Sequence, residues 1–152
     1  MIRQKDWAFM DIRLNNFDAF KDVYGFIAAN DVLRFVGMLL GEEVDKLGSP
    51  NDFIGHAGGD NFILITSADQ AEAIKNHVKQ RFDEEIQTHY NFIDRQQGFI
   101  NAPDESGQIQ HVSLMNMAAG VVSPRTHFFA DIREITEMAA EERRRDINPG
   151  NN

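Results

Sequence analysis

The sequence predicts an α+β domain of the ferredoxin-like kind, with a central antiparallel sheet flanked by helices. Short apolar runs bounded by turn residues alternate with amphipathic stretches, in the order strand, helix, strand, strand, helix, strand, helix. A segment rich in turn residues precedes the fourth main strand and predicts an extra hairpin arm. In such a plan the first strand lies beside the third.

The first half of this plan begins with a strand predicted at 7–10, a short apolar and aromatic run that ends at Asp11. A long helix is predicted over 26–47, because apolar residues recur there every three or four positions until a Gly-Ser-Pro stop. Two strands follow at 53–57 and 62–65, and the glycine-containing turn between them predicts a hairpin.

The next helix is predicted to begin at an N-cap, either Ser67 or Asp69, and to continue to about His89. Residues 91–110 mix glycine, proline and short apolar pieces, which indicates the hairpin arm, with its exposed tip at 103–107.

The final segments are a strand over 111–122, whose mixed pattern predicts burial on both faces, and an amphipathic helix over 131–145. Residues 1–147 are therefore expected to form a single domain, and 148–152 a disordered tail. The buried stripe of the last helix is predicted to contain Ile132, Ile135 and Met138.

The composition fits one soluble domain, since 42% of the 152 residues are hydrophobic and 26% are charged. With 15 Lys and Arg against 24 Asp and Glu, the net charge is −9, so no nucleic acid is expected as a partner. The basic run Arg143–Arg145 is interpreted as a solvated helix end.

The absence of cysteine excludes disulfides and thiolate chemistry. No apolar run reaches the roughly 20 residues of a membrane helix, so we expect no membrane insertion and a cytoplasmic location.

Two carboxylates are the candidate chemical groups. Asp11 ends the first strand and Asp60 lies in the hairpin turn, so the predicted topology brings them towards one another. Together they could hold Mg²⁺, while Gly58 and Gly59 would let the backbone approach a triphosphate. The alternative is structural, because Gly-Gly-Asp-Asn is also an ordinary hairpin turn. The five histidines lack metal-ligand spacing, and the sequence has no Gly-x-Ser-x-Gly elbow of a serine hydrolase.

Several segments follow one another in a distinctive order: Trp7–Ile12, Phe17, Asp22–Phe26, Val32–Leu33, Gly58–Phe62, Val112–Val122 and Met138–Ala140. Over roughly residues 7–145, this order resembles the GGDEF family of diguanylate cyclase domains. The resemblance implies a nucleotide-cyclase and polymerase-palm fold, and active members condense two GTP molecules into cyclic di-GMP across a dimer.

The resemblance also shows where the working residues depart from the family pattern. Asp60 matches the family's metal-binding acid, but Asn61 replaces the catalytic Glu, and an amide cannot act as a general base. In the guanine pocket, Lys21 stands where the family has Asn, and Asn30 where it has Asp. Both changes leave the guanine edge poorly paired, so selective GTP binding should be weakened.

The metal ligands that the resemblance implies are Asp11, Ile12 and Asp60. Without a gap, the family's first-strand Asp aligns with Arg13. We favour a two-residue insertion in a loop over 13–16, which brings Asp11 into register, because Asp11-Ile12 follows the apolar strand as in the family. The family's inhibitory Arg-x-x-Asp site lacks its Arg and keeps Asp52, so product feedback is not expected.

The sequence thus predicts a degenerate GGDEF domain, which has lost cyclase activity and acts as a regulatory, nucleotide-sensing or dimerising module in bacterial cyclic di-GMP-type signal transduction. Its expected partners are other domains of a signalling protein, GTP or another nucleotide, and a second copy in a homodimer. One alternative is an active nucleotidyl cyclase that uses Asp11 and Asp60 with Mg²⁺. The other is a purely structural interaction unit without a ligand.

Overall fold

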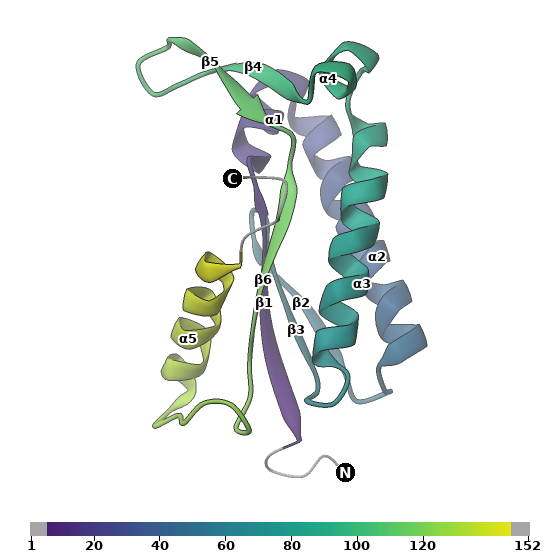
Figure 1. Ribbon diagram of the computed structural model, residues 1–152, viewed down its shortest axis with the longest axis vertical. Coiled ribbons are helices and arrows are strands. Elements are labelled where there is room, and N and C mark those ends of the chain that lie inside the picture. The colour runs from purple at the N-terminus through teal and green to yellow at the C-terminus, as the bar shows by residue number, and fades with distance from the viewer. Residues whose placement is uncertain (1–5, 147–152) are drawn as a thin grey trace.

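The computed structural model describes residues 6–146, which form a four-stranded antiparallel sheet in the order β2-β3-β1-β6 and a separate two-stranded sheet, β4-β5 (Figure 1). This order confirms the ferredoxin-like prediction and the pairing of the first strand with the third. The strands are β1 (Trp7–Asn15), β2 (Phe53–Gly58), β3 (Asn61–Ser67), β4 (Phe99–Pro103), β5 (Ile109–Ser113) and β6 (Asn116–Val122). The helices are α1 (Phe17–Tyr24), α2 (Phe26–Leu47), α3 (Ala71–Glu85), the 3₁₀ helix η1 (Ile86–His89), α4 (Phe92–Gln97) and α5 (Ile132–Arg145).

The sheet has a helical layer on each face. Helices α2 and α3 cover one face, and α5 crosses the other over β6 and β1 (Figure 1). The main core lies under α2 and α3, where alternate residues of β1 such as Ile12 and Leu14 are almost fully buried. A smaller cluster under α5 is built on Phe9, Val122 and Ala139. Because side chains alternate between the two faces along β1, this strand contributes residues to both hydrophobic clusters.

β1 extends well beyond the predicted end at Asp11. Its pairing with β6 continues without a shift as far as Asn15. The charged Asp11 and Arg13 interrupt the apolar run in sequence, but Ile12 and Leu14 point to the core between them, so the strand continues. Asp11 thus lies in mid-strand, and it is 8% exposed.

Helix α1 was not predicted, because it has only eight residues and directly follows the strand. Its signal is the spacing of Phe17, Phe20 and Tyr24, which places three rings on one face. The helix begins after Asn16, whose φ of 67° turns the chain sharply out of β1. α1 thereby follows β1 directly and packs against α2 and β4.

The predicted hairpin arm is confirmed as β4 and β5, which project at one end of the molecule (Figure 1). The single strand predicted over 111–122 is wrong, because the chain leaves the arm at Leu114 and Met115 before β6 begins. The Tyr90 hydroxyl accepts a hydrogen bond from the Met115 amide at 2.8 Å and fixes this break. Burial of Tyr90 raises its pKa to about 12. Nearby, the Tyr24 hydroxyl donates to Asp94 on α4, a helix that was also missed.

Three further expectations need correction or lie outside the description. The N-cap of α3 is Gln70, without a side-chain bond, rather than Ser67 or Asp69. The N-cap of α5 is Asp131, whose carboxylate accepts a hydrogen bond from the Glu134 amide. Ile132 is 78% exposed rather than buried, because it directly follows this cap. The tail predicted at 148–152 lies outside the described residues.

Candidate functional site

The turn of the β2–β3 hairpin lies beside the C-terminal end of β1. Asn61 pairs with Arg13 across the β1–β3 ladder, and the Leu14 amide donates to the Asp60 carbonyl at 3.2 Å. Gly58 and Gly59 have φ values of 111° and 54°, which are strained for residues with a Cβ. The glycine pair therefore shapes a tight turn whose polar residues lie beside β1.

The Asn61 side chain makes the central contacts of this site. Its amide nitrogen donates to Asp11 Oδ1 at 2.7 Å and to the Ile12 carbonyl at 2.8 Å. Both partners can only accept when the carboxyl is ionised, so the NH₂ end of the amide faces them. Asn61 thus joins the two β1 residues that the sequence assigned to metal binding.

Each of the two carboxylates also faces an arginine. Arg143 Nε on α5 lies 3.3 Å from Asp11 Oδ1, and both side chains are about nine-tenths buried, at 10% and 11% exposure. Arg13 Nε lies 3.9 Å from Asp60 Oδ1 at a more exposed position. Among residues 6–146, neither Nε atom has a hydrogen-bond partner of good geometry, so these contacts are mainly electrostatic. The site contains two guanidinium charges opposite two carboxylates.

Close packing of α5 brings Arg143 to this position. Gly120 on β6 has no Cβ, and one built there would lie 2.2 Å from the Arg143 amide nitrogen and 2.2 Å from the Ala139 carbonyl oxygen. The glycine lets the helix backbone lie directly on the sheet beside Asp11. The prediction that Arg143 belongs to a solvated helix end is therefore wrong for this residue. The available signal was Gly120 in a strand predicted to be buried on both faces.

The loop expected at 13–16, in which the sequence placed a two-residue insertion, is absent. β1 continues to Asn15 and α1 begins at Phe17, so residues 13–16 contain no loop. Arg13, rather than Asp11, stands opposite Asn61 beside the hairpin turn. The ungapped alignment places this arginine at the family's aspartate position, and the assignment of that position to Asp11 stays a prediction.

The two predicted guanine-reading residues lie away from these contacts. Lys21 is exposed in the last turn of α1, and Asn30 is half-buried on α2. Within residues 6–146, neither side chain has a hydrogen bond or ion pair with the hairpin. The structure therefore brings together Asp11, Ile12, Asp60 and Asn61, and leaves Lys21 and Asn30 on the neighbouring helices.

Two other residues near the hairpin have structural contacts. His56 Nε2 lies 2.7 Å from the Gly59 carbonyl oxygen, and the His56 ring stacks on Phe62. Asp52 accepts hydrogen bonds from the Ser49 amide at 3.1 Å and from the Thr66 hydroxyl at 2.8 Å. These contacts hold the start of β2 against β3, which accounts for Asp52 without a ligand.

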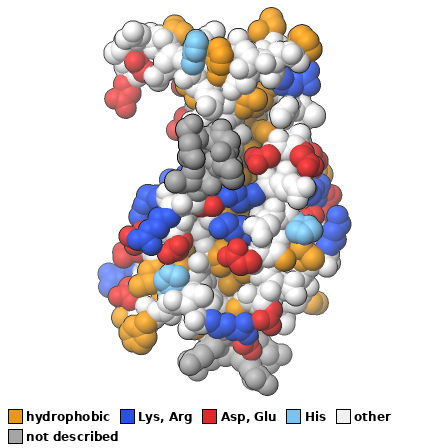
Figure 2. Space-filling view, in the orientation of Figure 1, with side chains coloured by type: hydrophobic (Ala, Val, Ile, Leu, Met, Phe, Trp, Pro, Cys, Tyr) orange, Lys and Arg blue, Asp and Glu red, His pale blue; other side chains and the backbone are white. Residues whose placement is uncertain are grey.

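The described part of the chain contains no group of three or more His, Cys, Asp or Glu side chains placed to share a metal ion. Over the same range, no helix is both long and apolar enough to span a bilayer. On the face seen in Figure 2, the basic and acidic side chains are interspersed, without a single basic field.

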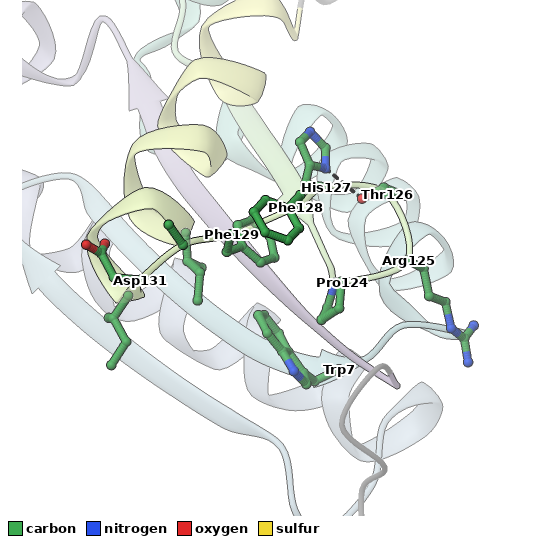
Figure 3. A pocket seen from close by; sticks show the side chains of 11 residues that line it. Trp7, Pro124, Arg125, Thr126, His127, Phe128, Phe129 and Asp131 are labelled. Carbon is green, nitrogen blue, oxygen red and sulfur yellow. Dashed lines mark hydrogen bonds between the residues drawn. The ribbon is translucent and has the colours of Figure 1, made fainter.

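A separate hollow of about 790 Å³ lies at the opposite end of β1, beside Trp7 and the loop that leads to α5. Figure 3 shows Trp7, Pro124 and Phe128 around it, and Arg125 directed away. Arg125 instead pairs with Asp6 at 2.7 Å and with Asp69. The hollow is thus mainly apolar and distinct from the hairpin site.

Comparison with solved structures shows the same fold. The active GGEEF domain of a diguanylate cyclase from Vibrio cholerae matches 90% of this chain and 73% of its own, with 21% identity and a TM-score of 0.61. The GGDEF domain of DgcB from Caulobacter crescentus, in complex with c-di-GMP, matches 93% and 71%, with 13% identity and a TM-score of 0.63. The GGDEF domain of FimX from Pseudomonas aeruginosa matches 94% and 75%, with 11% identity and a TM-score of 0.61.

No curated protein matches the chain. The family described as "Diguanylate cyclase, GGDEF domain" matches residues 2–102, which is more than half of the 152 residues and includes β1, α1, α2 and the β2–β3 hairpin. The chain therefore belongs to the GGDEF family.

Proposed function

We propose that this GGDEF domain does not cyclise GTP and acts as a regulatory module in bacterial cyclic di-GMP-type signalling. The observation that carries the proposal is the double hydrogen bond from the Asn61 amide to Asp11 Oδ1 and the Ile12 carbonyl. Both oxygens thus accept hydrogen bonds from within the chain, and Asn61 itself supplies no carboxylate.

The donor set does not fit Mg²⁺. Magnesium prefers oxygen ligands in octahedral geometry, and here the oxygens of Asp11 and Ile12 already accept from Asn61. Arg143 and Arg13 supply positive charge next to the two carboxylates, and they would repel a divalent cation. The chain itself thus provides the hydrogen bonds and the charge balance that a bound metal would provide.

The base-reading positions support the same conclusion. A carboxylate accepts two parallel hydrogen bonds from the guanine edge, whereas Asn30 offers one acceptor and one donor. Lys21 adds a second donor where an acceptor is needed. An unpaired buried polar group costs about 1–3 kcal/mol, so GTP is a poor ligand for this domain.

A domain that neither binds Mg²⁺ nor cyclises GTP acts through its contacts with other protein domains. The proposed role is to transmit or report a signal to other domains of a cytoplasmic signalling protein, in which the fold is kept and the catalytic groups are replaced. Nucleotide sensing is a separate property, and titration calorimetry with GTP and with cyclic di-GMP measures it directly.

The test is incubation of the protein with GTP and Mg²⁺, followed by chromatography. We expect no cyclic di-GMP, and no Mg²⁺ binding by calorimetry. A double variant, Arg13→Asp with Asn61→Glu, restores acids at both family positions and should gain measurable Mg²⁺ affinity. Cyclic di-GMP formation by the unmodified chain would contradict the proposal and favour the active cyclase.

A further inference from the structure

The two edge strands of the main sheet, β6 and β2, differ in how far their outer sides are protected from pairing with another strand. At the β6 edge, the Ala119 amide donates to Asp146 Oδ2 at 2.8 Å, and the same oxygen accepts from Lys79 Nζ at 2.7 Å. Lys75 also pairs with this carboxylate at 3.7 Å. An outward-facing amide of β6 is therefore already bonded, and charged side chains surround it, which is how proteins protect sheet edges from pairing.

The β2 edge has none of these features. β2 is the outermost strand of the sheet, and among residues 6–146 no strand pairs with its outer side. Its sequence, Phe-Ile-Gly-His-Ala-Gly, contains no Lys, Asp, Glu, Arg or Pro. Phe53 at its start is 53% exposed. An uncharged edge strand with exposed apolar side chains is a template for strand addition.

The backbone groups that face outward follow from the ladder, since the amide and carbonyl of successive residues point to opposite edges. Ala119 faces out of β6, so its neighbour Gly120 bonds inward to Asp11. Ile12 must then bond to β3. Its partner Phe62 on β3 therefore bonds to β1, and the next residue, Ile63, bonds to Gly55 on β2. The neighbours of Gly55, Ile54 and His56, then have their backbone groups directed to the outer side of β2.

We propose that the β2 edge pairs antiparallel with the β2 edge of a second copy of this chain. Pairing Ile54 of one copy with His56 of the other uses both outward-facing residues of each strand, and places Gly55 on the two-fold axis. The arrangement is self-complementary, as a two-fold interface requires. It joins the two sheets into one of eight strands.

Charge favours this surface over the others for self-association. The chain carries a net charge of −9, so two copies repel one another over most of their surfaces. β2 itself is uncharged. Of the two flanking acids, Asp60 faces Arg13, and Asp52 is held within the chain by hydrogen bonds from Ser49 and Thr66. The β2 edge therefore allows close approach of a second copy.

An apolar strip adds to the same contact. Phe53 and Gly55 are opposite Ile65 and Ile63 in the ladder, so these residues share the face of the sheet on which α5 lies over β6 and β1. Ile63 and Ile65 are partly buried against the Phe9 cluster there, while Phe53 at the edge is exposed. A two-fold axis perpendicular to the sheet places the strips of both copies on the same side and next to each other. The proposal concerns association and is independent of whether the domain binds metal or GTP.

The first experiment is sedimentation equilibrium of the full chain over a range of concentrations. We expect a monomer–dimer equilibrium, and Phe53→Lys should raise the dissociation constant at least about tenfold by placing a charge on the edge. Phe92→Lys is the matched control, because Phe92 is also exposed, at 66%, but lies on α4. It should leave the dissociation constant unchanged.

A second measurement needs no variant. Hydrogen–deuterium exchange of the unmodified chain, at concentrations below and above the dissociation constant, should show slower exchange of the Ile54 and His56 amides only in the dimer. A chain that stays monomeric at all concentrations overturns the proposal. So does a dimer in which these amides exchange as fast as in the monomer, or one that Phe53→Lys and Phe92→Lys weaken equally.

Discussion

Gly120 on β6 lies directly against the backbone of Arg143 on α5, with no space for a methyl group between them. Gly120→Ala should therefore push α5 away from the sheet and destabilise the fold by about 2–3 kcal/mol, the upper range for overpacking. Urea denaturation measures the change. Gly37→Ala on α2 is the control, because a Cβ there meets no atom within 4 Å and should stabilise the helix by about 0.5–1 kcal/mol. Equal effects of the two substitutions would contradict the prediction.

Asn61→Asp should destabilise the protein by about 2–3 kcal/mol at pH 7, because a second carboxylate would face the carboxylate of Asp11 and the carbonyl of Ile12. This proximity raises the pKa of the new carboxyl group in the folded state. The loss should therefore be small near pH 4 and grow as the pH rises towards 7, as measured by thermal unfolding. Asn61→Ala removes the same bonds without adding charge, so it should lack the additional loss that Asn61→Asp develops towards pH 7.

Tyr90 should make the fold sensitive to alkali. Burial raises its pKa to about 12 in the folded state, against 10.0 for an unperturbed tyrosine. A raised pKa contributes stability below the unfolded value, and this contribution is lost as the pH rises from 10 to 12. Two pKa units correspond to about 3 kcal/mol. Denaturation at pH 9 and pH 11.5 tests this, and Tyr90→Phe should reduce the difference. Tyr24, whose pKa is also raised by burial, contributes in the same direction.

Asp146→Ala should cost about 2–4 kcal/mol, because it leaves Lys75 and Lys79 mostly buried without their carboxylate, together with the Ala119 amide. Asp146→Asn retains an acceptor for the amide and should lose less. Calorimetric unfolding compares the two variants. An Ala variant with unchanged stability would show that this carboxylate contributes nothing to the β6 edge.

The regular elements of the fold were predictable because their patterns are long. The apolar spacing over 26–47 predicted α2 with its bounds, and the glycine turn predicted the β2–β3 hairpin. The short helices α1 and α4 were missed, since eight and six residues carry little periodicity. The break at Leu114 was missed because it depends on a hydrogen bond from Met115 to Tyr90, which lies 25 positions earlier in the chain.

The candidate site was predictable only in part. Asp11 and Asp60 were named because the predicted topology places the first strand beside the third, and Ile12 and Asn61 were named through the family resemblance. Arg143 could not be placed, since it comes from α5, and its burial depends on Gly120 more than twenty positions away in sequence. The charge that faces Asp11 thus comes from a residue far away in the sequence, which local sequence patterns do not reveal.

The double hydrogen bond of Asn61 also has an evolutionary consequence. Asn61→Glu alone would place a third carboxylate among Asp11 and Asp60, and Arg13→Asp alone would leave Asp60 facing another acid without a counter-charge. Each single reversion costs stability before it restores any metal ligand. Under the proposed loss of cyclase activity, a lineage with this arrangement therefore faces a mutational barrier to regaining catalysis.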